Sequence, residues 1–184
     1  MSFATDSIHM HCTAQATTQT PLGPLLLVRT ARGLAGAWFE GQQHHPGALA
    51  APHQPDDALL HDAAQQLQAY FDGARDTFAL PLDLQGTAFQ RSVWQALLRI
   101  APGATCSYGD IATALGSPRA VRAVGGAVGR NPVSLIVPCH RVIGRDGSLT
   151  GYAGGVDRKR ALLRLEQAAQ VAQLARVAHV PLAA

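Results

Sequence analysis

The sequence has few of the patterns that mark secreted, membrane or disordered proteins. Its three cysteines, Cys12, Cys106 and Cys139, are widely spaced without a C-x-x-C pair, so we expect neither a disulfide framework nor a cysteine-rich zinc site. Residues 1–12 contain no lysine or arginine, and the longest apolar runs, such as 25–28, are too short to cross a bilayer. A hydrophobic content of 47% over 184 residues excludes general disorder. These absences favour a cytoplasmic protein with no membrane segment.

The charge of the chain is small in total but divided between its halves. The net charge is +3, yet residues 1–85 carry 3 Lys+Arg against 8 Asp+Glu, a balance of −5. From residue 86 onward there are 12 Lys+Arg against 4 Asp+Glu, a balance of +8. A basic half suggests a polyanionic partner, and a solvated basic surface is the equally weighted alternative.

Changes in composition and periodicity along the sequence divide the chain into four segments. Residues 1–20 show little periodicity and are expected to form a mobile arm. Residues 21–85 are expected to form a small α/β scaffold domain, and residues 86–170 a mostly helical domain that carries the chemistry. An Ala-rich tail over 171–184 has no assignable role.

The scaffold segment contains strand and helix patterns but no cluster of residues typical of catalysis. Two β-favouring runs, 25–30 and 34–40, predict a hairpin in which Gly33 takes a positive φ. Apolar residues at helical spacing after Asp56 predict a helix that ends at a glycine. Residues 77–84 predict a further strand.

Two short helices in the second half predict a helix-turn-helix. A capping-box pattern at Thr87 begins an earlier helix, and a similar pattern at Ser107 begins the first helix of the pair. Gly116 ends that helix, and Ser117 with Pro118 is a typical start for the second.

The second of these helices has three distinct faces. Its apolar stripe is expected to pack on the domain, and a flank with two glycines is poor for helix stability. Close approach of a nucleic-acid strand would explain the glycines, and tight packing between helices is the somewhat favoured alternative. The stripe consists of Val121, Val124 and Val128, the flank of Arg122, Gly126 and Gly129, and the opposite side of Arg119 and Arg130.

The clearest candidate for chemistry is Cys139. The run Leu135–Val137 predicts a short strand that stops at Pro138, which would present Cys139 at a strand end. His140 and Arg141 follow directly, and basic neighbours stabilise the thiolate that makes a cysteine nucleophilic. In an extended segment His140 would face away from the sulfur, so a turn or a bridging water is needed.

A histidine acting as a base usually has an acid that orients it, and Glu166 is the candidate. It lies beside an apolar helical face and has no lysine or arginine three or four residues away. A solvated glutamate at the helix margin is the slightly favoured alternative on spacing alone. Histidines of the first half, among them His9, His11, His44 and His53, match no strong metal-binding pattern, so we expect no metal site.

The second half resembles a known family. Residues 138–141, with Asn131-Pro132 before them and residues 151–155 after them, are similar to the active-site signature of the methylated-DNA–protein-cysteine methyltransferases, the O6-alkylguanine-DNA alkyltransferases. The resemblance extends from about Gly86 to Glu166 and is looser in the first half. Ala153 stands where some relatives carry serine, which bears on substrate range.

The resemblance implies a fold and an activity. The fold would be α/β, with a small ribonuclease-H-like N-terminal domain followed by a winged helix-turn-helix that enters the minor groove. The activity would be direct reversal of DNA damage: a single irreversible transfer of the alkyl group from O6-alkylguanine, with O4-alkylthymine as a further candidate, to a cysteine after base flipping. The implied partner is double-stranded DNA containing the lesion, with the protein a monomer and no cofactor. A lesion-binding protein without catalysis and a helix-turn-helix regulator are the alternatives.

The resemblance also implies roles for individual residues. Cys139 would accept the alkyl group, His140 would act as its base through a water, and Glu166 would orient His140. Asn131 would brace the active-site turn, Tyr108 would help to flip the nucleotide and bind the guanine, and Arg122 would fill the space left in the base stack. The implied DNA-binding residues are Arg122, Arg119, Tyr108, Gly126, Arg130 and Ser107, and the implied substrate pocket consists of Val137, Pro138, Tyr152, Ala153 and Gly154.

Overall fold

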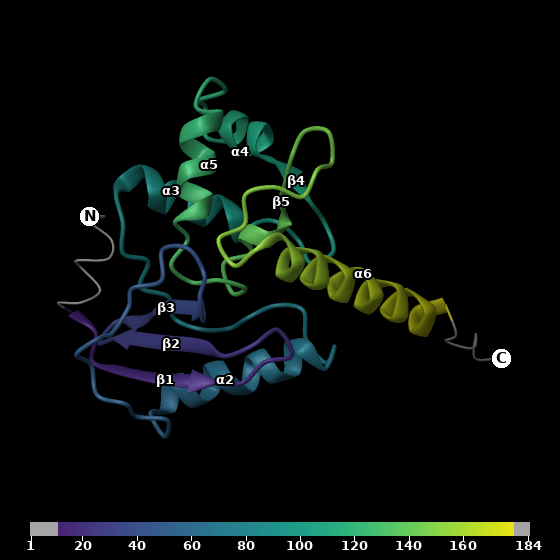
Figure 1. Cartoon of the computed structure of the whole chain (residues 1–184). Coiled ribbons are helices and arrows are strands. Elements are labelled where there is room, and N and C mark those ends of the chain that lie inside the picture. Colours follow the sequence, from purple (N-terminus) through teal and green to yellow (C-terminus); the bar gives the residue numbers. More distant parts are fainter. Residues whose placement is uncertain (1–10, 179–184) are drawn as a thin grey trace.

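Three antiparallel strands form the sheet of the N-terminal half, in the order β1-β2-β3. In this computed structural model, which describes residues 11–178, the strands are β1 (Ala14–Thr18), β2 (Leu25–Thr30) and β3 (Gly33–Phe39). Helix α2 (Ala58–Phe71) lies along one face of the sheet (Figure 1). The hairpin between β2 and β3 and the helix were both predicted from the sequence, and both are confirmed.

Three details of this half differ from the sequence-based predictions. The expected mobile arm is wrong over β1, which pairs with β2 along its whole length because its small residues alternate into the core. Gly33 has no positive φ; a Cβ there would lie 2.5 Å from the Pro81 carbonyl oxygen, so the glycine permits close approach of that segment. Residues 77–84 form a single bridge, Leu34 to Leu82, instead of a strand.

The C-terminal half is mostly helical and contains a two-stranded parallel pair, β4 with β5. Both predicted capping boxes are confirmed, at Thr87 for α3 and at Ser107 for α4. Helix α6 continues well past residue 170, so the predicted boundary of the tail falls inside it, and the helix projects beyond the body of the protein (Figure 1). The elements are α3 (Ala88–Leu97), β4 (Cys106–Ser107), α4 (Tyr108–Ala114), α5 (Val121–Gly129), the 3-10 helix η1 (Cys139–Arg141), β5 (Val142–Ile143) and α6 (Val156–Ala178).

The two halves join along β3. Ala37 donates its N–H to the Pro132 carbonyl at 2.9 Å and accepts the Ser134 N–H at 2.9 Å, so the segment that leads to Cys139 extends the sheet. Every residue of β3 is buried as a result, and one hydrophobic core contains side chains of both halves, such as Phe39 and Trp94. None of the described helices is long and apolar enough to cross a membrane.

Candidate active site and nucleic-acid interface

Cys139 begins the 3-10 helix η1, and its side chain is buried. The strand predicted over residues 135–137 is absent: these residues form a turn in which Leu135 has a φ of 72°, a left-handed conformation that is rare for leucine. Burial raises the pKa of the Cys139 thiol to about 11, although a hydrogen bond from Asn131 and the charge of Lys159 act to lower it. The thiol is therefore protonated at neutral pH and needs a base to become reactive.

Asn131 fixes the turn that carries the cysteine. Its side-chain amide donates to the Val137 carbonyl at 2.8 Å and to the Cys139 sulfur at 3.0 Å. Its side-chain oxygen accepts the Val133 N–H at 3.0 Å. With a further bond to the Val133 carbonyl at 3.3 Å, one buried amide thus bonds three main-chain groups and places a donor on the sulfur, where a thiolate would form.

His140 and Glu166 are in contact although they are far apart in the sequence. His140 Nε2 lies 2.8 Å from Glu166 Oε1, and both side chains are buried. Burial lowers the pKa of His140, which keeps the ring neutral at pH 7. Because a carboxylate only accepts hydrogen bonds, Nε2 must carry the proton and Nδ1 must hold the lone pair. Nδ1 is buried and has no hydrogen-bond partner among the described residues, which leaves it able to take up a proton.

Glu166 gathers donors from three separate parts of the chain. Arg141 binds both carboxylate oxygens, with Nη2 at 2.8 Å from Oε1 and Nε at 3.0 Å from Oε2. The Gly103 N–H donates to Oε2 at 3.0 Å, and the Tyr70 hydroxyl to Oε1 at 2.8 Å. Burial acts to raise the pKa of Glu166, but the hydrogen bonds from His140 and Arg141 outweigh it and hold the pKa well below its usual range. The solvated-glutamate alternative is therefore wrong.

The sequence reasoning missed three residues of this network. Arg141 was noted only as a cationic neighbour of Cys139, and Tyr70 lies in the half where no chemistry was found. Lys159 is fully buried and donates to the carbonyls of Val142 and Thr150, and burial lowers its pKa. The sequence signal available for Lys159 was that it is the single lysine among 15 basic residues.

The residues of the implied substrate pocket come from the turn that carries Cys139 and from a later loop that lies against Tyr108. Tyr108 donates its hydroxyl to the Thr150 carbonyl at 3.1 Å, and a Cβ at Gly151 would lie 2.6 Å from that hydroxyl, so the loop approaches Tyr108 closely. The Ala153 carbonyl accepts the N–H of Gln43, a second contact from the N-terminal half, at 2.9 Å. The other members, which are all buried, are Val137, Pro138, Tyr152 and Gly154.

The helix-turn-helix exists as α4 and α5, with two corrections. Helix α5 begins at Val121, not at Pro118, because residues 117–120 form a turn and Ala120 occupies the cap without a side-chain bond. Val121 is 40% exposed, so of the three valines only Val124 and Val128 pack on the domain, together with Ala127.

The glycine flank of α5 is open. A Cβ at Gly129 would meet no atom within 4 Å, and one at Gly126 would meet only the mobile end of the Arg130 side chain. Tight packing between helices, the alternative favoured from the sequence, is therefore wrong, and the surface is accessible to an external partner. Arg119 and Arg122 are exposed, and neither takes part in an ion pair within residues 11–178.

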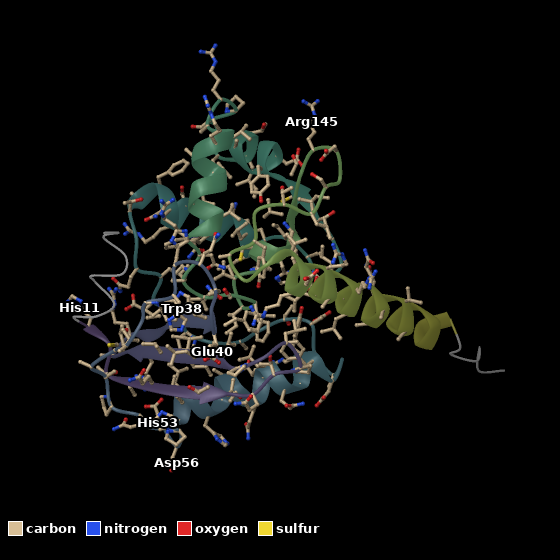
Figure 2. All side chains as sticks on the ribbon, viewed as in Figure 1. His11, Trp38, Glu40, His53, Asp56 and Arg145 are labelled. Carbon is tan, nitrogen blue, oxygen red and sulfur yellow. The ribbon has the colours of Figure 1, made fainter. Side chains whose placement is uncertain are left out.

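Two further residues, Ser107 and Arg145, bear on the implied DNA interface. The Ser107 hydroxyl caps α4 by accepting the Asp110 N–H at 3.1 Å and donates to the Asp110 carboxylate at 2.8 Å, so it is already engaged. Arg145 lies at the tip of the loop between β5 and α6, beside α4, and points away from the body of the protein (Figure 2). The sequence reasoning did not single out Arg145.

The metal hypothesis has no geometric support in the described part of the chain. Across residues 11–178, no three His, Cys, Asp or Glu side chains lie close enough to hold a metal ion. His45 lies against Trp38, with ring centroids 6.3 Å apart, and His61 contacts Gln65. His9 lies outside the described residues.

Comparison with known proteins gives a consistent result for both halves. Residues 14–84 match the ribonuclease-like domain, and residues 88–168 the DNA binding domain, of the family model for 6-O-methylguanine DNA methyltransferase. The methylated-DNA–protein-cysteine methyltransferases of Mycobacterium tuberculosis and Methanosarcina barkeri are 48% and 47% identical to this chain, over 86% and 81% of it and 94% of each relative. The crystal structure of Mycobacterium tuberculosis OGT in complex with DNA superposes with a TM-score of 0.78 at 46% identity, covering 85% of this chain and 94% of that one.

Proposed function

The chain belongs to the O6-methylguanine DNA methyltransferase family, and we propose that Cys139 is the residue that accepts the alkyl group. The protein is a DNA repair enzyme that reverses alkylation directly and is consumed by its single reaction. The observation that supports Cys139 is the direct contact between its sulfur and the Asn131 amide, in a turn whose next residue is held by Glu166.

In the proposed reaction the sulfur of Cys139 attacks the alkyl carbon bound to guanine O6. A carbon–sulfur bond forms, the carbon–O6 bond breaks, and the base leaves with the bonding electron pair. His140 takes the thiol proton at Nδ1 through an intervening water, and the departing guanine gains a proton in return, so charge is balanced. Glu166 keeps His140 in the tautomer that leaves Nδ1 basic. The thioether that remains on the protein has no leaving group at neutral pH, so each molecule reacts once.

The proposed DNA interface is the open face of α5 together with Tyr108. Small residues on this face allow the DNA backbone or groove to approach closely, and Arg119, Arg122 and Arg130 supply positive charge. We propose that Arg122 fills the stack when the damaged nucleotide leaves it, and that Tyr108 then donates to the guanine instead of to Thr150. The target base must leave the duplex because the Cys139 sulfur is buried.

The lesion range, the active unit and the compartment are parts of the same proposal. The preferred lesion is O6-alkylguanine, with O4-alkylthymine as a secondary substrate. Ala153 offers a main-chain N–H but no hydroxyl to the base, which bears on which alkyl groups are accepted. The active unit in this proposal is a monomer. The three cysteines form no disulfide, which suits the reducing cytoplasm.

The test is a labelling experiment with residue resolution. The protein is incubated with a duplex that contains O6-methylguanine, and peptides are mapped by mass spectrometry. We expect one methyl group per molecule on Cys139, and none in a Cys139→Ala variant that still binds the duplex. Lesion binding without transfer would indicate a lesion-binding protein, and a preference for one sequence without lesion preference would indicate a regulator; either result would overturn the proposal. Repeating the reaction with O4-methylthymine and with bulkier O6 groups defines the substrate range.

A further inference from the structure

The reactive network contains one side chain from the N-terminal half. Tyr70, in α2, donates its hydroxyl to Glu166 Oε1 at 2.8 Å across 96 residues of sequence. The same oxygen accepts from His140 Nε2, also at 2.8 Å. Tyr70 is 3% exposed, so solvent competes little for this hydrogen bond.

The position and the direction of this donor are both fixed. The Tyr70 ring packs against Phe71 and Phe78, with centroids 5.5 Å and 5.3 Å apart, which locks the side chain. Burial and the charge of Glu166 raise the pKa of Tyr70 well above its usual range, so the hydroxyl keeps its proton. Because a carboxylate only accepts, the hydroxyl must donate to Glu166.

Glu166 needs such a constraint because it is not tightly packed on every side. Tyr70 and Glu166 both line a cavity of about 500 Å³ between the end of α2 and α6, whose other members include Pro102 and Gln170. A carboxylate beside open volume can rotate unless hydrogen bonds hold it. Arg141 holds the side facing η1, and the Tyr70 hydroxyl is the donor contributed from the wall of the cavity.

We propose that Tyr70 is a positioning residue for alkyl transfer, whose hydroxyl holds Glu166 in the orientation that keeps His140 aligned. The inference rests on the proposed roles of Cys139, His140 and Glu166. The N-terminal half then contributes to the reaction, because the packing of α2 against the sheet positions Tyr70, which through Glu166 orients the base His140. Removing the hydroxyl leaves Oε1 with His140 and Arg141 as its donors, which loosens its orientation and makes it a more basic partner for His140.

The test uses Tyr70→Phe in the full-length protein, which removes the hydroxyl and keeps the ring that packs on Phe71 and Phe78. The matched control is Thr30→Val, since Thr30 also donates a buried hydroxyl to a carboxylate, that of Asp83, at 2.7 Å. Two quantities are measured for each protein: the single-turnover rate of methyl transfer against protein concentration and pH, and the titration of His140 by NMR without DNA.

For Tyr70→Phe we expect the rate at saturating protein to fall about tenfold, as the loss of one hydrogen bond to a charged group implies. The half-saturating concentration should stay unchanged because Tyr70 is buried away from the DNA-facing helices. The pH midpoints of His140 titration and of the acid limb of the rate should both move upward, whereas Thr30→Val should change neither.

Each outcome separates this inference from the proposed function. If the wild type transfers methyl to Cys139 and Tyr70→Phe matches it in rate and in His140 titration, the role of Tyr70 is overturned and the proposed function stands. If Thr30→Val slows transfer as much as Tyr70→Phe does, the effect is general destabilisation and the role is again overturned. If the wild type transfers nothing, the proposed function fails, and the NMR titration still decides whether Tyr70 controls His140.

Discussion

Replacing Asn131 should damage stability and reactivity through separate atoms of one side chain. Asn131→Ala removes the acceptor of the Val133 N–H, which is buried, whereas the Val137 carbonyl keeps the Cys139 N–H as a donor at 2.8 Å. A buried main-chain group left without a partner costs about 1–3 kcal/mol, so we expect a loss of roughly that size in the free energy of unfolding. For a chain of this length that is a fall in melting temperature of about 2–12 °C.

The same substitution also removes the donor to the Cys139 sulfur. A hydrogen bond to a charged group contributes about 1.5–3 kcal/mol, which corresponds to a rise of about 1–2 units in the thiol pKa above its present value. The thiolate fraction at a given pH, and with it the rate of alkyl transfer, should fall about 10- to 100-fold. Asn131→Asp should be slower still, because a carboxylate beside the sulfur repels the thiolate.

The assay combines urea unfolding with the pH dependence of iodoacetamide labelling, read on the Cys139 peptide by mass spectrometry. Gln66→Ala is the matched control, because Gln66 is also a buried amide that accepts a main-chain N–H, that of Ala79 at 2.9 Å, and donates to the Ala79 carbonyl. It should lose less stability, because Ala79 is exposed and water can replace the lost bonds, and it should leave Cys139 labelling unchanged. If the labelling midpoint of Cys139 is the same in Asn131→Ala as in the wild type, Asn131 does not stabilise the thiolate and the reasoning is refuted.

Three further predictions follow from the site and the interface. Glu166→Gln leaves the buried Arg141 charge unpaired, so urea unfolding should show that the free energy of unfolding falls by about 3–5 kcal/mol. Single-turnover assays should show a much slower transfer. Wild-type values for both would contradict the network described above. The pKa of His140 is lowered in the folded protein, so the unfolded chain binds a proton first as pH falls below 6.5. Stability should therefore decline below that pH. It should decline further near pH 4, because the folded pKa of Glu166 is also lowered and its carboxyl gains a proton on unfolding. A free energy of unfolding that is flat from pH 7 to 4 would refute this. Gly126→Ala should stabilise the protein by up to about 1 kcal/mol, since only a flexible side-chain end lies near the new methyl, yet weaken DNA binding in a titration; unchanged affinity would show that this face does not contact DNA.

Local signals predicted the local structure well. The capping boxes at Thr87 and Ser107 each use residues three positions apart, and both helices begin where those patterns place them. Residues 135–137 were predicted as a strand because their side chains favour β structure, but the side chain of Asn131, six residues before Val137, and main-chain bonds hold them in a turn. Val121 was assigned to the core from its helical phase, yet it is 40% exposed.

Gly33 illustrates the same limit in another way. A glycine was expected at this position because a hairpin turn often requires a positive φ. The actual requirement is space for Pro81, which lies 48 residues later in the chain, and no local pattern reports such a neighbour. The strand β1 was missed for a similar reason, since short runs of Ala, Gln and Thr become a strand only when a partner strand lies beside them.

The sequence by itself determined the reactive residue types and their family: a cysteine followed by histidine and arginine, a helix-turn-helix with a glycine flank, and a basic second half. Only the tertiary structure decided that Glu166 is buried against His140 and Arg141, that Tyr70 of the other half completes its hydrogen bonds, and that the thiol pKa is raised to about 11. The physical reason is that pKa values and side-chain orientation depend on burial and on contacts between residues far apart in the sequence, which exist only once the chain has folded.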